Sequence, residues 1–270
     1  MGKPLMIGAV AYTANVVEIW EGIRDYFAGT ESEMDFVLYS NYGRQVESLL
    51  AGHVDIAWNT NLAWARTTAQ TVGECRALAM RDTDAAFRTH FVVRKGGGSG
   101  ELEKLRGRRI ALGSRDSAQA AILPLHYLQQ AGLAESDVDL MRINSDVGKH
   151  GDTGRSEYDA LRAVLDDQAD VAALGSNTWA AMNREGALAD SFDLYWTSPE
   201  YSHCNFTALS ALSEERAEPW VQRLLAMDWD NPEHRPILEM EGLRRWVLPK
   251  LAGYDSLFEA IRLQNIPPTW

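Results

Sequence analysis

His203 and Cys204 are adjacent in the sequence, and no other pair in the chain offers as much chemistry. A cysteine attacks as the thiolate, and a nearby imidazole or cation lowers the pKa of the thiol. Neighbouring residues of an extended chain point to opposite sides, so we expect Cys204 to meet His150 rather than its own neighbour. The alternative is that Cys204 is only a small buried residue near a hinge.

Metal and cofactor chemistry have weaker support in the sequence. His150, His203, Cys204 and Asp152 are of metal-ligating types, but no tight ligand spacing joins them. We therefore expect no metal and no cofactor. In an enzyme, Cys204 and His203 would be the nucleophile or the acid/base groups.

A second candidate site is an oxyanion site at the start of a predicted helix. Ser114 and Ser117 precede this helix, and Gln119 lies in its first turn. A helix N-terminus carries unpaired N–H groups and about half a positive charge, which attracts anions. Ser117 could equally be a plain N-cap. His150, in a glycine-rich loop, can hydrogen-bond an oxyanion near neutral pH.

Polar residues also follow two predicted strands nearer the N-terminus. Tyr12 and Thr13 follow the first strand, and Asn59 and Thr60 follow the third. The carboxyl ends of parallel strands form the ligand-binding edge of an open α/β sheet, although such residues are also ordinary caps and turns. Arg44 could bind an anion bidentately, although most arginines lie on the surface.

These residues need a scaffold, and short apolar runs alternate with amphipathic segments along the chain. This alternation predicts an α/β fold with mixed, mostly parallel sheets. In the first helix we expect a buried face made of Val17, Ile19, Trp20, Ile23 and Phe27. Strands are expected at residues 5–10, 34–39, 54–58, 76–80, 90–94, 109–112, 138–143, 171–174 and 192–196, and helices at 16–27, 42–51, 118–131, 157–166, 214–227, 232–240 and 254–263.

An imperfect repeat links the two halves of the chain. Residues 49–57 and 164–172 each read as the end of a helix, a tight turn, an aspartate and a buried strand, followed by a polar loop that opens another helix. Any two βα units look alike to some degree. The stronger interpretation is two similar lobes, each presenting a polar loop at a strand end, with a ligand cleft between them.

Composition narrows the class of protein. The chain has 270 residues and a net charge of −12 without a basic cluster, so nucleic acid is not an expected partner. No stretch reaches the ~20 apolar residues of a membrane span, so no membrane insertion is expected. The first residues lack the pattern of a secretory signal, which predicts a cytoplasmic protein as given, or a periplasmic one if a signal was removed.

Four segments together resemble the phosphonate/phosphate-type solute-binding proteins, a branch of the type II periplasmic-binding-protein fold. They are residues 42–58, 117–124, 148–150 with 160–165, and 198–207. The resemblance implies a discontinuous lobe I at residues 1–93 plus 205–270 and a lobe II at residues 94–204. It also implies a ligand contact at Tyr42, an oxyanion held by Ser117 and its helix N-terminus, and a further contact at His150.

The sequence departs from that family at two places. Ala118, Gln119 and Ala120 replace most of the small hydroxyl residues that the family carries at this helix start. The return segment, residues 201–205, lacks the acidic residue that commonly receives a ligand cation. An amine-bearing phosphonate is therefore not the expected ligand.

Three functions remain open from the sequence. The first is a solute-binding protein for a small anionic ligand such as a phosphonate or phosphate, with an ABC permease as partner if the chain is exported. The second is a cytoplasmic enzyme on the same fold, resembling lyases, decarboxylases or desulfinases. The third is a cytoplasmic sensor or ligand carrier.

Overall fold

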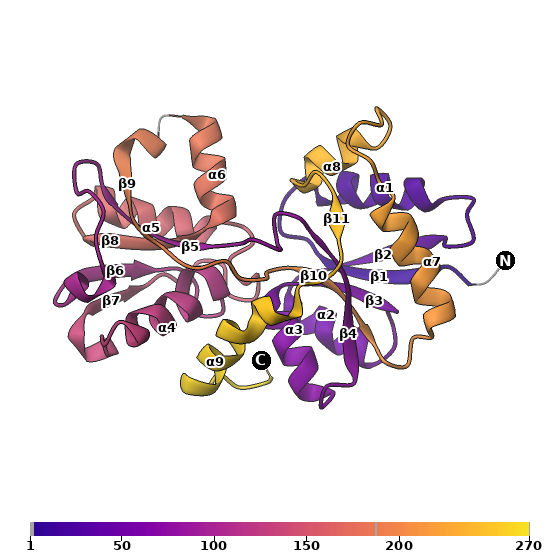
Figure 1. Ribbon diagram of the computed structural model, residues 1–270, viewed down its shortest axis with the longest axis horizontal. Coiled ribbons are helices and arrows are strands. Elements are labelled where there is room, and N and C mark those ends of the chain that lie inside the picture. The colour runs from indigo at the N-terminus through magenta and orange to yellow at the C-terminus, as the bar shows by residue number, and fades with distance from the viewer. Residues whose placement is uncertain (1–2, 187, 270) are drawn as a thin grey trace. The chain divides into compact units, whose positions relative to one another are not determined.

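The computed structural model describes residues 3–186 and 188–269, which divide into two compact units (Figure 1). Unit 1 consists of Met1–Ala86, Tyr201–Asp255 and Ile266–Trp270, and unit 2 of Phe87–Glu200 and Ser256–Asn265. Each unit is an α/β layer structure built around its own sheet. No helix among the described residues is both long and apolar enough to span a membrane.

These boundaries differ from the ones expected after residues 93 and 204. Strand β5 (Thr89–Arg94) belongs to unit 2 because it pairs there with β8 (Val171–Gly175) and β9 (Phe192–Thr197). The residues just before Asn205 belong to unit 1, where the His203 amide donates to the Asp84 carbonyl at 3.0 Å. Residues 256–265 join unit 2, where Gln264 Nε2 donates to the Ile122 carbonyl at 2.8 Å. Each of these strand pairs and hydrogen bonds joins segments that are far apart in the sequence.

The described part of unit 1 contains a six-stranded sheet of order β11-β4-β10-β3-β1-β2. β1 is parallel to β2 and β3, whereas β10 is antiparallel to β3 and β4, and β11 to β4. Four of the six strands therefore run in the same direction. The strands are β1 (Leu5–Val10), β2 (Met34–Tyr39), β3 (Ile56–Asn59), β4 (Cys75–Arg81), β10 (Asn205–Leu209) and β11 (Trp246–Val247).

In unit 2 the described strands form a five-stranded sheet of order β7-β6-β8-β5-β9. β6 (Arg109–Leu112) is parallel to β7 (Asp139–Arg142) and to β8, while β5 is antiparallel to both of its neighbours. Four of these five strands run in the same direction. Both sheets are therefore mixed.

Helices cover the sheets of both units. In α1 (Val16–Phe27) the buried face is the expected one, except that Val16 replaces Val17, which is 47% exposed. Alternate residues of a strand face opposite sides of a sheet. Ile7 accordingly packs in the core cluster with α1 and α7, whereas Val10 packs with α2 and α3. The helices are α1, α2 (Tyr42–Leu50), α3 (Asn61–Gln70), α4 (Leu123–Gln130), α5 (Arg155–Leu165), α6 (Ser176–Glu185), α7 (Glu214–Leu225), α8 (Arg235–Glu241) and α9 (Asp255–Leu263).

The repeated aspartates occupy equivalent places in the two units. In unit 1 the Asp55 amide donates to the Met6 carbonyl, and the Asp55 carboxylate accepts from the Met6 amide, both at 2.8 Å. In unit 2 Asp170 makes the same pair of bonds with Arg109, at 2.8 and 2.9 Å. Each aspartate thus joins the start of one strand to the start of its parallel neighbour.

Candidate functional site

Polar residues gather at the carboxyl edge of the unit 1 sheet. Asn59 ends β3, and Thr60 caps α3 by accepting a hydrogen bond from the Ala63 amide at 3.2 Å. Both side chains are fully buried. Gln45 Nε2 donates to Asn59 Oδ1 at 2.8 Å, whereas Asn59 Nδ2 has no hydrogen-bond partner among the described residues. A buried donor without a partner costs about 1–3 kcal/mol, which makes Nδ2 a candidate ligand contact.

The other predicted residues of unit 1 differ in exposure. Tyr42, the first residue of α2, is fully buried beside Val10 and Val46. Arg44 lies on the surface, where its guanidinium pairs with Glu47 at 3.0 Å with both side chains more than half exposed. Tyr12 is half-buried, and the exposed Thr13 donates from Oγ1 to Asn15 Oδ1 at 2.6 Å. The Glu47 carboxylate offsets part of the Arg44 charge.

The predicted oxyanion helix of unit 2 opens with a π-helical turn, η2 (Ala118–Ile122), that continues into α4. Ser117 caps it: Ser117 Oγ accepts from the Ala120 amide at 3.2 Å, and the Ser117 carbonyl accepts from both Ala121 and Ile122. The first N–H groups of a helix lack intrahelical partners. Ser117 and Gln119, both fully buried, therefore flank a backbone suited to an anion.

The loop that carries His150 packs directly onto this helix start. The His150 carbonyl accepts from Gln119 Nε2 at 3.3 Å, and His150 is 1% exposed. Gly151 has a φ of +82°, and a Cβ there would lie 2.5 Å from Ser117 Oγ and 2.6 Å from Gln119 Nε2. Only glycine fits this position. The structure therefore brings Ser117, Gln119 and His150, three residues predicted for the site, into one cluster.

Ser114 is hydrogen-bonded to the same loop. Its hydroxyl donates to the Asp146 carboxylate and accepts from the Asp146 amide at 3.2 Å. Thr153 Oγ1 donates to the other Asp146 oxygen at 2.7 Å. The Ser114 side chain is therefore bonded to the loop from Asp146 to Thr153, which it holds in place.

Glu157 of α5 contacts the cluster through Gln119 and is fully buried. It accepts from Gln119 Nε2 at 3.1 Å and from the Gly175 amide at 3.0 Å. Burial raises the pKa of Glu157 to about 7, although hydrogen bonds from Thr178, Gly175 and Gln119 oppose the rise. Glu157 is thus a neighbour of the helix start whose charge changes near neutral pH.

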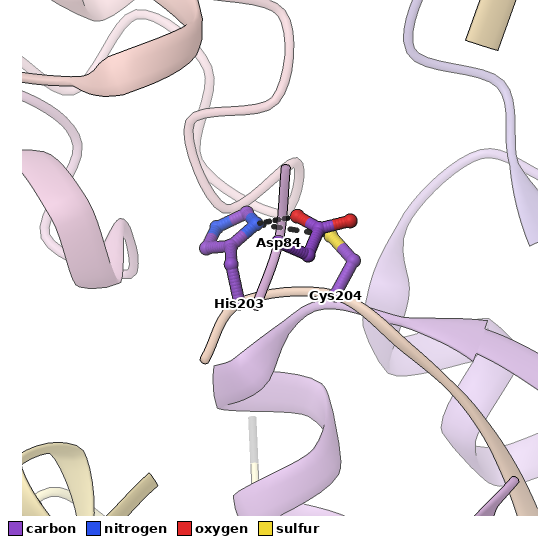
Figure 2. Close-up of side chains that lie close together, drawn as sticks. All are labelled: Asp84, His203 and Cys204. Atoms are coloured by element: carbon purple, nitrogen blue, oxygen red, sulfur yellow. Dashed lines mark hydrogen bonds and ion pairs between the residues drawn. The ribbon is translucent and has the colours of Figure 1, made fainter. Parts of the chain in front are cut away.

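Cys204 contacts its own neighbour, which corrects the expectation that the two adjacent side chains point to opposite sides. Cys204 Sγ lies 3.1 Å from His203 Nδ1, and the side chains of both residues turn toward Asp84 (Figure 2). The alternation rule fails because regular strand structure begins only at Asn205, one residue after the pair. In the less regular segment before it, adjacent side chains can turn to the same side.

Asp84 completes this second cluster. Its Oδ1 lies 3.2 Å from His203 Nδ1, and Arg81 Nε donates to its Oδ2 at 2.5 Å. Burial alone would raise the pKa of Asp84, but the Arg81 guanidinium and the His203 hydrogen bond hold it at about 2. Sulfur and carboxylate face the same ring nitrogen. This differs from a nucleophilic triad, in which the acid and the nucleophile bond to different nitrogens.

Sequence reasoning missed Glu157 and Asp84 as members of these clusters. Glu157 could have been found, because Glu157, Ala160, Leu161 and Val164 share the buried face of α5. Asp84 gave no such signal, because it lies in a polar turn 119 residues before His203.

Comparisons with known proteins agree with this architecture. The profile of the family described as "ABC transporter, phosphonate, periplasmic substrate-binding protein" matches residues 9–254. The probable ABC transporter phosphite binding protein PhnD1 of Prochlorococcus marinus (strain MIT 9301) is 25% identical over 245 residues, covering 86% of this chain and 79% of that protein.

Solved structures show the same fold. PhnD1 from Prochlorococcus marinus in complex with methylphosphonate superimposes with a TM-score of 0.76 at 22% identity, covering 97% of this chain and 98% of that one. A binding protein component of an ABC phosphonate transporter from Pseudomonas aeruginosa gives a TM-score of 0.66 at 16% identity, covering 98% of this chain and 86% of that one. The fold is that of the type II periplasmic binding proteins.

The chain therefore belongs to the phosphonate family of periplasmic substrate-binding proteins of ABC transporters. This confirms the resemblance carried by the four sequence segments, and with it the solute-binding function that we expected. Members of this family work with a transporter, so a permease is the partner that family membership implies.

Proposed function

We propose that the chain binds a small phosphorus oxyanion, such as methylphosphonate or phosphite, at the cluster of Ser117, Gln119 and His150. The observation that carries this proposal is the packing of the loop around Gly151 against a helix start with buried polar side chains. Backbone N–H groups and hydroxyls there offer several donors to one tetrahedral anion. PhnD1, which shares the fold, is described with both ligands.

A ligand without a positive charge suits the return segment, residues 201–205. The return segment at residues 201–205 carries no carboxylate. A cationic substituent would therefore lack an acidic partner from this segment, which favours methylphosphonate over an amine-bearing phosphonate.

In unit 1, we propose the amide nitrogen of Asn59, Nδ2, as a further donor to the anion. It lies at the carboxyl edge of the sheet, where ligands of open α/β sheets bind. A ligand oxygen would satisfy an amide group that has no hydrogen-bond partner among the described residues. That Asn59 and Ser117 contact the same ligand remains a prediction. So does delivery to an ABC permease in the periplasm, the compartment of the family.

Isothermal titration calorimetry with methylphosphonate tests the position of the site. Ser117→Ala removes a hydrogen bond to an ionised ligand, worth about 1.5–3 kcal/mol, so the affinity should fall by about 10- to 100-fold. Asn59→Asp replaces the donor with a carboxylate and should weaken binding by at least as much.

Ser213→Ala is the matched control, because Ser213 is an exposed residue at the N-cap of α7. It should leave the affinity unchanged. Wild-type affinity in Ser117→Ala and Asn59→Asp, with both variants folded by circular dichroism, would place the site elsewhere.

A further inference from the structure

Nitrogen, oxygen and sulfur atoms meet in the cluster of Asp84, His203 and Cys204 in unit 1 (Figure 2). Cys204 Sγ and Asp84 Oδ1 lie 3.1 and 3.2 Å from His203 Nδ1, and the three ligand atoms lie within 4.8 Å of one another. All three residues are buried, with exposures of 0–2%. Three chemically different donors, brought together from two distant parts of the chain, thus face one point.

Two explanations for the cluster are a hydrogen-bond network and a metal site, and the convergence of two contacts on one nitrogen favours the metal site. A single proton on Nδ1 cannot make two strong, well-aligned bonds at once, to the carboxylate and to the sulfur. A metal ion can bind all three donors together. In a tetrahedral zinc site with bonds of about 2.0–2.3 Å, the donors lie about 3.3–3.6 Å apart. The two separations from His203 Nδ1, 3.1 Å to Cys204 Sγ and 3.2 Å to Asp84 Oδ1, would need to open by only a few tenths of an ångström.

The surrounding residues hold the three donors in place. Arg81 binds both oxygens of Asp84, with Nε donating to Oδ2 at 2.5 Å and Nη2 donating to Oδ1 at 3.2 Å, and this fixes the carboxylate with Oδ1 also 3.2 Å from His203 Nδ1. The His203 amide donates to the Asp84 carbonyl at 3.0 Å, so the main chains of the two segments are also joined. Partners that orient metal-binding carboxylates in this way are typical of metal sites.

The fixed charges also allow a cation. Arg81 brings one positive charge, and its guanidinium pairs with both Asp84 and the buried Glu241, the latter at 3.2 Å. The two carboxylates therefore carry one negative charge more than Arg81 neutralises. A thiolate, an imidazole and a carboxylate are the donor types that Zn²⁺ prefers.

We propose that Asp84, His203 and Cys204 form a binding site for Zn²⁺ in unit 1. Three protein ligands leave one tetrahedral position for water or a small ligand. The site shares no residue with Ser117, Gln119, His150 and Asn59, so it stands or fails independently of the proposed phosphonate site. A metal-ion titration without phosphonate can therefore test it alone.

Zinc-edge X-ray absorption on a tag-free Cys75→Ser chain is the direct test. Cys75 is the only other cysteine in the chain and lies outside the cluster, so this variant keeps the complete site and a single thiol. We expect one Zn²⁺ per chain and one sulfur scatterer at about 2.3 Å, which only Cys204 can supply. No zinc uptake by the metal-free chain, or zinc bound only by nitrogen and oxygen, would overturn the proposal.

Titration with Co²⁺ checks the other ligands in solution. The sulfur-to-cobalt charge-transfer band should appear in the wild type and in Cys75→Ser, and should be lost in Cys204→Ser. His203→Gln should weaken Co²⁺ binding by at least about 100-fold, more than the loss of an outer-shell partner. A band that persists in Cys204→Ser, or an unchanged affinity in His203→Gln, would contradict the assignment.

Discussion

Glu157 shows how a single buried residue can couple the candidate site to pH. Its carboxyl group is fully buried and shares Gln119 with the loop that carries His150. Burial raises its pKa from 4.5 to about 7, so the folded chain holds this proton more tightly than the unfolded chain does. The contribution to stability is therefore complete below about pH 4.5 and is lost as the pH rises through about 7.

Glu157→Gln should remove this pH dependence. The amide keeps a similar shape and cannot ionise, so the variant should gain up to about 3 kcal/mol relative to the wild type between about pH 5 and 8. Urea unfolding of both chains at several pH values measures the difference. Glu103→Gln, which changes an exposed carboxylate, is the control and should follow the wild type. Equal pH slopes in the wild type and Glu157→Gln would show that Glu157 is not buried as a neutral acid.

Cys204 marks the limit of residue-level prediction in this chain. Its candidacy for chemistry was evident from residue type, because it stands beside His203. Its partner was not, because an alternation rule for strands was applied to a segment that precedes the strand. Asp84 reaches it through a turn whose sequence resembles any solvated turn.

At the scale of elements, the start of the helix that Ser117 caps differs from the regular helix expected at residues 118–131. Pro124 has no N–H group to donate back to the preceding turn. The carbonyls of Ala120 and Gln119 accept instead from the Gly113 amide at 2.8 Å and from Thr89 Oγ1 at 2.9 Å. A π-helical turn results, as is frequent at functional sites. One partner, Gly113, directly follows β6 and the other, Thr89, lies in β5, so the proline alone did not predict the turn.

The repeated aspartates make a prediction at the same scale. Asp170→Ala removes bonds from the Arg109 amide at 2.9 Å and from Arg109 Nη2 at 2.7 Å, which join β6 to the start of β8. The free energy of unfolding should fall by about 2 kcal/mol, as expected for hydrogen bonds to a charged group. Denaturant unfolding at neutral pH measures it.

Asp166→Ala is the matched control for that change, because Asp166 is exposed at the C-cap of α5. It should change stability by less than about 0.5 kcal/mol. Equal effects of the two substitutions would mean that the repeat reflects a general βα pattern rather than a clamp between strands.

At the scale of the whole molecule, local patterns predicted the elements better than the boundaries of the units. Hydrophobic periodicity placed α1, β1, β2 and β6 at their observed bounds. The boundaries depend on pairings between distant segments, such as β5 with β9, and no local pattern encodes them. Of the residues predicted for the site, Ser117, Gln119 and His150 come together, whereas Arg44 lies on the surface; that this cluster binds a ligand stays a prediction.

Net charge and ligand charge also belong to this scale. The chain carries −12 and is nevertheless proposed to bind an anion. Fields from distant surface charges are screened within about 8–10 Å at physiological salt, so local donors decide the binding. The central claim is thus that a helix start and its packed loop bind a phosphorus oxyanion without transforming it.

Phosphorus NMR of methylphosphonate titrated with the chain tests that claim most directly. We predict a saturable, stoichiometric change in the ligand signal, and full recovery of unchanged methylphosphonate when the protein is denatured and removed. Absence of any saturable change for both methylphosphonate and phosphite, or the appearance of a new phosphorus species, would contradict the account.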